Sequence, residues 1–379
     1  MMKMKIAIVC YPTFGGSGVM ATELGMSLVN HGHEVHFIAY KKPVRLTDLN
    51  QNLHFHKVNV PDYPLFSFVP YELALSTKLV DVVKNNSIDV LHVHYAIPHA
   101  YAAYMAKKML KEQSINIPIV TTLHGTDITL VGNHPSYKTA VTFSINKSDI
   151  VTCVSQSLKE DTLDQFDIKK EIIVIPNFID ISKYIIQQDL CLHENPIPAK
   201  EFIISHVSNF RPVKNVTNVI KIFYNIQKQL KAQLLMIGEG PEKSVAEDLC
   251  KELGISHLVK FLGNTNQVEK NLCHSDLFLL PSSAESFGLA ALEAMASKVA
   301  VISSNAGGLP EINIDGETGY VEDFDNIDEM SKKAISILSS KEQLDSFKNK
   351  AFLKAKEYDI NNLVPFYEKT YQRALDSIK

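Results

Sequence analysis

Short apolar runs alternate with longer segments of helical periodicity along most of the chain. Runs rich in β-branched residues are typical of strands buried on both faces of a parallel sheet, and the periodic segments between them predict helices. In the first half the pattern predicts strands at 5–10, 34–40, 89–94, 118–124 and 149–155, with helices at 19–30, 71–85, 98–112 and 136–147. This alternation indicates a doubly wound α/β domain.

A second series of the same kind follows a polar, proline-bearing segment, residues 187–201, which is typical of a linker between domains. We therefore expect a first domain at 1–186 and a second at 202–360. The pattern of residues 361–379 predicts a terminal amphipathic helix. This helix could pack back on the first domain. In the second domain the pattern predicts strands at 202–208, 233–238, 259–263, 276–282 and 299–304, and a helix at 216–230.

The expected fold class is α/β, with two Rossmann-like, doubly wound domains facing a cleft. Ligands of such sheets bind beyond the carboxyl ends of the strands. The side chains that carry the chemistry should therefore lie in the loops that join each strand to the next helix.

Composition limits the classes of protein to consider. The 379 residues are 45% hydrophobic and 21% charged, with a net charge of −4, which gives no electrostatic reason to expect nucleic acid as a partner. No stretch reaches the roughly 18 apolar residues of a membrane span. The five cysteines are scattered and none forms a C-x-x-C pair, so we expect free thiols in a cytoplasmic protein, without a disulfide framework or zinc site.

The first predicted strand is followed by the glycine-rich loop "YPTFGGSGVMA". Backbone amides around Gly16, Ser17 and Gly18 could approach an anion closely at the start of a helix. The spacing is not the G-x-G-x-x-G of a dinucleotide fingerprint, and a tight turn without a ligand explains the glycines equally well.

Histidines gather at the ends of two other predicted strands of the first domain. His124 stands at a strand tip in "TTLHGTD", before a glycine, which favours a site over an ordinary core histidine. In "HVHYAIPHA", His92 and His94 share a strand face and His99 follows. Three histidines suggest zinc, but no carboxylate or cysteine cluster lies nearby in the sequence, so we expect no metal there.

Two loops of the predicted second domain carry charge. In "SNFRPVKN", Arg211 and Lys214 open a helix and could converge on a diphosphate, although a solvated charged loop has the same composition. In "AESFGLAALEAMA", Glu285 precedes a helix start whose free N–H groups favour an anion, and Glu293 lies about two turns further along. Ordinary helix electrostatics would also explain the two carboxylates.

Together these stretches, with "IPNFID", "GEGP" and "NAGGLPEI", resemble the retaining glycosyltransferases of family 4, which have the GT-B fold. The resemblance covers essentially the whole chain. It implies a nucleoside diphosphate-sugar donor, with Arg211 and Lys214 on the diphosphate, Glu293 on the ribose and His124 beside the sugar. It also implies that Glu285 and the backbone of Ser286, Phe287, Gly288 and Leu289 surround the donor sugar and phosphates.

Within the family, "YPTFGGSGVMATELG", "HVHYAIPHA" and "TTLHGTDITLVG" look like the enzymes that transfer GlcNAc from UDP-GlcNAc to the hydroxyl of L-malate in the first step of bacillithiol biosynthesis. This implies His124, Glu285, Arg211 and Lys214 as catalytic residues, with no cofactor and no metal. The polar donors that could hold the malate carboxylates are Ser17, Tyr95, Thr122 and Lys138.

Other functions remain open from the sequence alone. A family 4 enzyme with an inositol phosphate or lipid acceptor would share most of these motifs, but the first domain has no basic, apolar run typical of a membrane surface. A sugar-nucleotide epimerase or a nucleotide-binding protein without activity are further alternatives. The sequence does not decide whether the protein is a homo-oligomer.

Overall fold

The computed structural model describes residues 3–13, 15–46, 49–62, 64, 68–193 and 201–378. The chain divides into two units, which we call the first and second domains. The first consists of Met1–Asn177 together with Ile360–Lys379, and the second of Phe178–Asp359. The first domain thus ends nine residues before the expected 186, and it includes the C-terminal segment.

The first domain is a parallel sheet of seven strands in the order β3-β2-β1-β4-β5-β6-β7. Five of these strands match the apolar runs of the sequence. The two that were missed, β3 and β7, end the sheet at its two edges, where partial exposure makes the hydrophobic pattern weaker. The strands are β1 (Lys5–Val9), β2 (Glu34–Ala39), β3 (Leu53–Lys57), β4 (Val90–His94), β5 (Ile119–Leu123), β6 (Ile150–Cys153) and β7 (Ile172–Val174).

The α-helices of the first domain follow the strands and cover the sheet. One apolar core packs α2 and α3 against alternate residues of the central strands, such as Ala7, Val9 and Leu91. These helices are α1 (Gly16–Asn30), α2 (Tyr71–Asn86), α3 (Tyr101–Lys111), α4 (Pro135–Lys147), α5 (Gln156–Gln165) and α14 (Ile360–Asp376).

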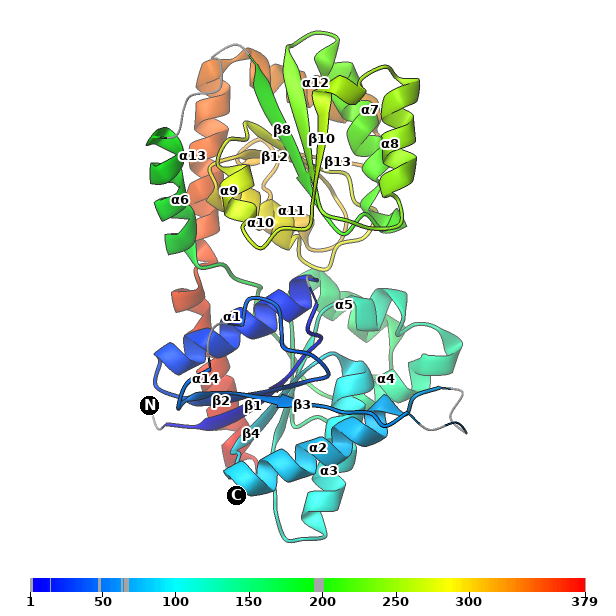
Figure 1. The fold of residues 1–379 in the computed structure, drawn as a ribbon, viewed down its shortest axis with the longest axis vertical. Helices are drawn as coiled ribbons and strands as arrows, with labels where there is room; N and C mark the ends of the chain where they lie inside the picture. The colour runs from blue at the N-terminus through cyan, green and yellow to red at the C-terminus, as the bar shows by residue number, and fades with distance from the viewer. Residues whose placement is uncertain are drawn as a thin grey trace. The chain divides into compact units, whose positions relative to one another are not determined.

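The C-terminal helix α14 is part of the first domain and lies beside α1 (Figure 1). Its Tyr371 is fully buried, and the phenol oxygen lies 2.8 Å from Nδ1 of His92 in β4. Glu368 accepts hydrogen bonds from the rings of His31 and His33, at the end of α1. The helix therefore covers the sheet through buried polar contacts as well as apolar packing.

The second domain is a parallel sheet of six strands in the order β10-β9-β8-β11-β12-β13. The sequence predicted all of them except β13, again an edge strand. The strands are β8 (Phe202–Val207), β9 (Ala232–Ile237), β10 (Val259–Gly263), β11 (Leu277–Leu280), β12 (Ala300–Ser304) and β13 (Gly319–Glu322).

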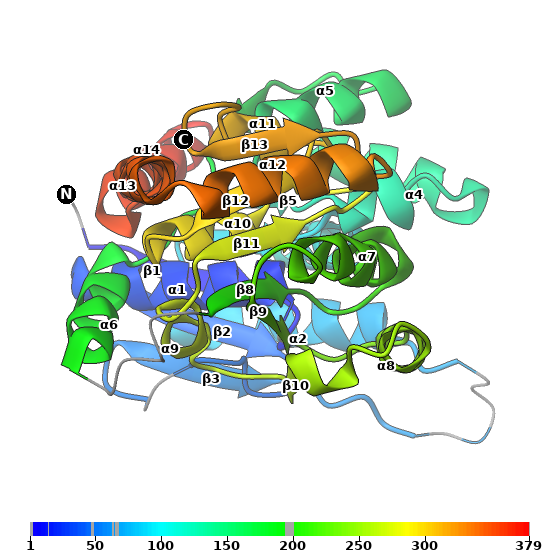
Figure 2. The same ribbon diagram turned by 90° about the horizontal axis from the view of Figure 1, so that it is seen from above.

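Helices cover both faces of the second sheet, and α7 and α8 lie on the opposite side from α6 in Figures 1 and 2. The main core packs α7, α8 and α12 onto the sheet through residues such as Val219, Phe223 and Ile337. The helices are α6 (Ile181–His193), α7 (Val216–Gln227), α8 (Lys243–Glu252), α9 (Val268–Leu272), α10 (Leu289–Ala296), α11 (Leu309–Ile312), α12 (Ile327–Ser339) and α13 (Lys341–Glu357). With two parallel α/β sheets, the predicted fold class is confirmed.

The expected linker at 187–201 is wrong over 187–193, because these residues belong to α6; residues 194–200 lie outside the described part. This helix packs against α9 and α10, and the Gln188 amide donates to the carbonyl of Ala296. The segment looked like a linker because it begins with two glutamines, yet Gln187 is buried and Gln188 is half-buried.

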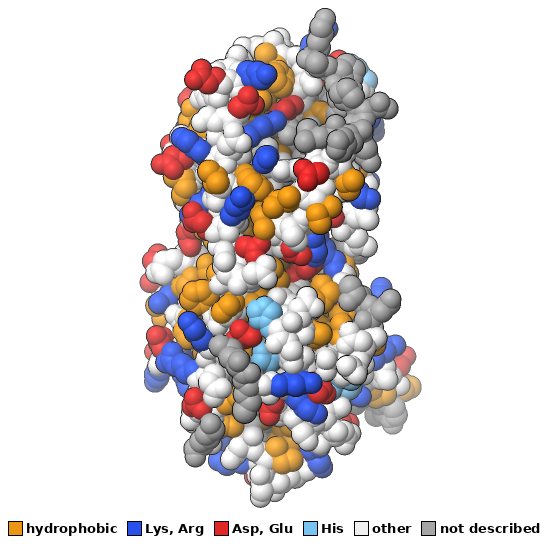
Figure 3. Space-filling view, turned by 90° about the vertical axis from the view of Figure 1, so that its left-hand side faces the viewer, with side chains coloured by type: hydrophobic (Ala, Val, Ile, Leu, Met, Phe, Trp, Pro, Cys, Tyr) orange, Lys and Arg blue, Asp and Glu red, His pale blue; other side chains and the backbone are white. Residues whose placement is uncertain are grey.

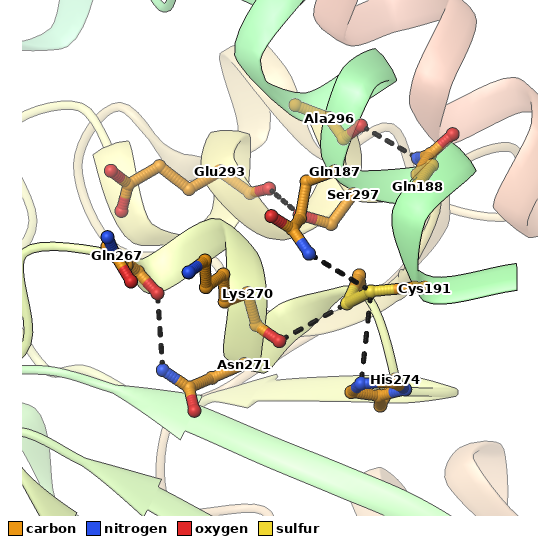
Figure 4. The surroundings of a disulfide bond; sticks show 11 residues. Gln187, Gln188, Cys191, Gln267, Lys270, Asn271, His274, Glu293, Ala296 and Ser297 are labelled. Atoms are coloured by element: carbon orange, nitrogen blue, oxygen red, sulfur yellow. Dashed lines mark hydrogen bonds between the residues drawn. A yellow bond between two sulfur atoms is a disulfide. The ribbon is translucent and has the colours of Figure 1, made fainter. Parts of the chain in front are cut away.

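The prediction that all cysteines are free is wrong for one pair. Cys191 of α6 and Cys273, just after α9, form a disulfide (Figure 4), with Cα atoms 6.4 Å apart and a sequence separation of 82. Such proximity arises from the packing of α6 on α9, which spacing in the sequence does not reveal. Cys10, Cys153 and Cys250 are free and buried.

On the face drawn in Figure 3, basic and acidic side chains are intermingled, and its described residues form no continuous basic stripe. Among the described helices, none combines the length and the apolar character needed to cross a membrane.

The contact between Tyr371 and His92 generates a prediction about stability. Replacing Tyr371 with Phe removes one hydroxyl and leaves the buried Nδ1 of His92 unpaired, which typically costs about 1–3 kcal/mol. We expect Tyr371→Phe to lower the urea midpoint of unfolding, whereas Tyr137→Phe, at an exposed tyrosine of the same domain, should not. Equal midpoints for the two variants would contradict the assigned role of this hydrogen bond.

Candidate functional site

In the first domain the strand order reverses between β1 and β4. In α/β proteins such a reversal, beyond the carboxyl ends of the strands, is the usual position of a ligand. Ser17 lies in the first turn of α1, directly after the loop that follows β1, and Tyr95 and His124 come directly after β4 and β5. Three residues singled out from the sequence thus lie at neighbouring strand ends.

Ser17 and Tyr95 are in direct contact. The Ser17 hydroxyl lies 2.7 Å from the Tyr95 phenol oxygen, across 78 residues of sequence. Tyr95 adopts a φ of 87°, which is uncommon for a bulky residue and is found mainly where surrounding structure or function requires it. Its backbone N–H donates to the carbonyl of Thr122 at the end of β5. The strained backbone therefore directs the phenol toward the start of α1.

The first N–H groups of α1 have no side-chain cap. The helix begins at Gly16, and its N-cap, Gly15, has no side chain to cap the first N–H groups. A Cβ on Gly18 would overlap the carbonyl oxygens of Tyr11 and Thr13, so this position requires glycine. The tight-turn interpretation is thus correct for Gly18, and it is compatible with an anion at the helix start.

His124 belongs to a cluster of buried imidazoles. Its Nε2 lies 2.7 Å from Nδ1 of His94, and the ring packs 5.3 Å from that of Tyr95, measured between centroids. The ring of His99 donates from Nδ1 to the carbonyl of His94. Nε2 of His94 and Nε2 of His99 are buried and have no hydrogen-bond partner among the described residues.

Asp127 holds this loop in place, a role that the sequence analysis did not assign. Its buried carboxylate accepts hydrogen bonds from the backbone N–H groups of Ala96, His124 and Gly125, at 2.8, 3.2 and 3.0 Å. It therefore ties the loop after β4 to the loop after β5. The aspartate two residues after a glycine in "HGTD" is the signal that could have identified this turn.

Two of the expected acceptor residues are placed elsewhere. Thr122 is fully buried, and its hydroxyl lies 2.7 Å from both Nε2 of His92 and the hydroxyl of Thr152, so it is not placed to touch an acceptor. Lys138 is exposed on α4, with its ammonium 5.6 Å from the ring centroid of Phe166. The structure brings Ser17 and Tyr95 together, but it does not join Thr122 or Lys138 to them.

In the second domain the strand order reverses between β8 and β11, and the loops after these strands are joined. The Asn215 amide donates to the carbonyl of Pro281 at 2.9 Å, and the N–H of Ser283 donates to the carbonyl of Val213 at the same distance. The stretches "RPVKN" and "PSSAESFG" therefore form one surface, joined by residues such as Val213 and Ser283 that are 70 positions apart in sequence.

Lys214 and Glu285 form an ion pair on this surface, with side chains 17% and 13% exposed. The Ser282 hydroxyl also donates to Glu285, at 3.3 Å. The Arg211 side chain is exposed and forms no ion pair among the described residues. A diphosphate would thus meet one solvated guanidinium and one ammonium that a carboxylate holds in place.

Glycines bring a third loop against Glu285. A Cβ on Gly307 would overlap the Glu285 carbonyl oxygen, which accepts a hydrogen bond from the N–H of Gly308 at 3.1 Å. Gly288 has a φ of 97° and precedes α10, leaving the first N–H groups of this helix without a side-chain cap. The backbone of the "AESFG" segment is therefore fixed from two sides.

The other residues expected at the donor differ in which of their atoms a ligand could reach. The ring of Phe287 is 1% exposed and packs edge-on against Tyr358, so only its backbone could contact a donor. Ser286 and Leu289 flank the same turn, at the start of α10. Glu293 lies in the second turn of α10 and is 6% exposed, which is far more buried than a solvated helix carboxylate.

Two family models match most of the chain. Residues 14–183 match the model described as Glycosyltransferase Family 4, and residues 189–354 match the model described as Glycosyl transferases group 1. The chain is 45% identical to the N-acetyl-alpha-D-glucosaminyl L-malate synthase of Bacillus anthracis, over 90% of this chain and 89% of that protein.

Solved structures of similar fold include glycosyltransferases of low sequence identity. Sucrose-phosphate synthase from Thermosynechococcus elongatus superposes with a TM-score of 0.80 at 18% identity, covering 99% of this chain and all of that one. The Anabaena HepE protein in complex with UDP gives a TM-score of 0.77 at 18% identity, covering 98% of this chain and all of that one. These likenesses concern the fold alone.

The buried histidines of the first domain predict how stability changes with pH. Burial lowers the pKa of His92 and of His124 to about 3 and that of His99 to about 4, and it holds the pKa of His94 well below its usual range. The folded protein keeps these rings neutral, whereas the unfolded chain protonates them below about pH 6.5. The free energy of unfolding should therefore fall as the pH drops below about 6.5, and keep falling toward about pH 4.

Burial raises the pKa of Asp127 to about 6, and this shift favours the folded state as the pH falls. It opposes the effect of the histidines, but it is one group against four. Each histidine contributes up to about 1.4 kcal/mol per pH unit. We expect urea midpoints to decrease from pH 7.5 to pH 5, with a shallower dependence in His99→Gln than in the wild type. Midpoints that do not change with pH would show that these rings are protonated in the folded state.

Proposed function

Because this chain belongs to glycosyltransferase family 4, we propose that it transfers GlcNAc from UDP-GlcNAc to the hydroxyl of L-malate, with retention of the anomeric configuration, in the first step of bacillithiol biosynthesis. The observation that carries the proposal is the 45% identity to a GlcNAc-malate synthase over 90% of the chain. At this coverage the identity extends into both domains.

The donor is assigned to the second domain. Arg211 and Lys214 bind the diphosphate, and the uncapped N–H groups at the start of α10 add a fixed positive dipole. Glu293 accepts hydrogen bonds from the ribose hydroxyls, which suits a carboxylate held in a buried position. Glu285 positions the Lys214 ammonium and lies beside the donor sugar.

The reaction breaks the bond between the anomeric carbon and the diphosphate oxygen. Charge develops on the departing UDP, where cations and helix N–H groups are already oriented, and this lowers the barrier without reorganisation. The malate oxygen attacks from the same face, forms the new glycosidic bond and gives its proton to the departing phosphate. We propose that no metal takes part in the transfer, because protein cations supply the positive charge.

The acceptor is assigned to the first domain. Ser17 and Tyr95 donate hydrogen bonds to a malate carboxylate, and the N–H groups at the start of α1 offer a further anion site. His124 lies next to Tyr95 and is neutral because burial lowers its pKa, so it can donate a hydrogen bond to a sugar hydroxyl. Thr122 supports His92 from the interior.

The diphosphate assignment predicts the effect of removing the cations. Arg211→Ala and Lys214→Ala should each lower kcat by about 10²–10³-fold, the usual effect of deleting a donor that stabilises developing charge. Lys251→Ala, at an exposed lysine that also pairs with a carboxylate, is the matched control and should leave kcat unchanged. UDP release with UDP-GlcNAc and L-malate measures all three. Near-normal turnover in both test variants would show that these residues do not bind the diphosphate.

The acceptor assignment predicts a preference for dicarboxylates. Without one carboxylate, hydrogen-bond donors of the site remain unpaired, and discrimination in such sites can reach about 10⁴-fold. We expect kcat/KM for L-malate to exceed that for D-malate, lactate and inositol phosphate. Tyr95→Phe and Ser17→Ala should reduce it for L-malate more than for lactate, whereas Tyr101→Phe, at a more exposed tyrosine, should change neither.

Equal kcat/KM values for lactate and L-malate would contradict the dicarboxylate site but not glycosyl transfer itself. Transfer to inositol phosphate or to a lipid acceptor in preference to L-malate would replace the proposed acceptor. Epimerised sugar formed from UDP-GlcNAc alone would contradict the proposed reaction itself.

A further inference from the structure

An edge of the first sheet carries a cluster of metal-binding side chains that the proposed transfer reaction does not use. Glu34 and His36 lie two residues apart on β2, so both point to the same face. The neighbouring edge strand β3 pairs His36 with His54 in register, which places His54 and His56 on that face as well. One carboxylate and three imidazoles are therefore adjacent.

The coordinating atoms of three of these residues converge. Oε1 of Glu34 lies 3.0 Å from Nε2 of His36 and 3.7 Å from Nε2 of His54, and all three atoms lie within 4.8 Å of one another. Zinc bonds to nitrogen and oxygen of about 2.0–2.2 Å in a tetrahedral site place neighbouring ligand atoms about 3.3 Å apart. The two distances from Glu34 bracket this value.

The hydrogen bonds of the cluster leave a position for a cation. Nε2 of His54 is buried and has no hydrogen-bond partner among the described residues, although it faces the carboxylate. The other oxygen of Glu34, Oε2, lies 3.5 Å from the ammonium of Lys5, so Oε1 is the oxygen turned toward the two rings. A buried polar atom without a partner is costly, and a bound metal would satisfy it.

His56 provides an outer contact of the kind that orients a metal-binding histidine. Its Nε2 lies 2.9 Å from Nδ1 of His36, the ring nitrogen that faces away from Glu34. Ligating histidines almost always have such a partner on the second nitrogen, which fixes the ring and the tautomer. The ring of His36 is also stacked on that of His54, with centroids 4.4 Å apart.

We infer that Glu34, His36 and His54 bind a divalent transition metal of the zinc class, oriented by His56, with solvent as a further ligand. Two imidazoles and one carboxylate are a ligand set that zinc accepts, and harder ions such as magnesium prefer oxygen ligands alone. The site joins the edge strand β3 to β2 and stabilises the first domain. It does not rest on the proposed function, because none of these residues belongs to the candidate donor or acceptor groups.

The test uses the full-length protein, stripped with EDTA and dialysed against Zn²⁺, with bound metal counted by mass spectrometry. We expect one tightly held zinc per wild-type chain and affinity at least about 100-fold lower in His54→Ala and in Glu34→Gln. His56→Ala, which removes an orienting contact, should lower the affinity about 10–100-fold. His257→Ala, at an exposed histidine of the second domain, is the control and should bind zinc like the wild type.

Two further measurements separate a metal site from a merely structural cluster. Zinc should raise the thermal midpoint of the wild type and of His257→Ala, but not of His54→Ala, because only binding to the folded state stabilises it. Co²⁺ should give a visible absorption spectrum that Glu34→Gln changes. The EDTA-stripped protein should keep its transfer activity, so the outcome for this site is independent of the outcome for the proposed reaction.

Wild-type protein that takes up no zinc at micromolar concentrations would overturn the inference and leave a hydrogen-bonded cluster. Unchanged uptake in both His54→Ala and Glu34→Gln would also overturn it, because the metal would then lie elsewhere. In that case loss of uptake in reduced Cys191→Ser protein would place the metal at the other described group of potential ligands, Cys191, Cys273 and His274.

Discussion

Close contact between backbone segments at the carboxyl edge of the second sheet is the constraint on which the proposed donor half-site depends. Gly238 and Gly240 lie against the carbonyls of Ser208 and Asn209, and Gly307 lies against that of Glu285, at distances that a Cβ would not permit. These contacts pack the loop after β9 against the loop after β8, and the loop after β12 against the loop after β11. The Lys214–Glu285 pair and the uncapped start of α10 keep their positions because these loops cannot separate.

In the first domain, polar side chains hold the loops in place. Asp127 joins two loops through three backbone N–H groups, and Tyr371 closes a buried hydrogen-bond chain through His92 to Thr122 and Thr152. The hydrogen-bond chain from Tyr371 to Thr152 is stabilising only while His92 is neutral and every member is paired. The half-site with Ser17 and Tyr95 therefore rests on an interior that is sensitive to acid, whereas the second domain relies on steric fit.

Much of this arrangement could be predicted from the sequence, because buried parallel strands give strong apolar runs and their ends locate the loops. The edge strand β3 was missed because "LHFHK" alternates with histidine and is half-exposed, and with it the cluster of Glu34, His36 and His54 was missed. Thr122 was misplaced because the face to which a strand residue points depends on register. The Cys191–Cys273 pair depends on tertiary packing alone.

The central claim is transfer of GlcNAc to L-malate with retention, and the product itself tests it most directly. Purified protein is incubated with UDP-GlcNAc and L-malate, and the product is examined by mass spectrometry and by proton NMR of the anomeric centre. We expect a single GlcNAc-malate conjugate with the small coupling between H1 and H2 that marks the α configuration. A β-linked product, or release of UDP without a malate conjugate, would contradict it.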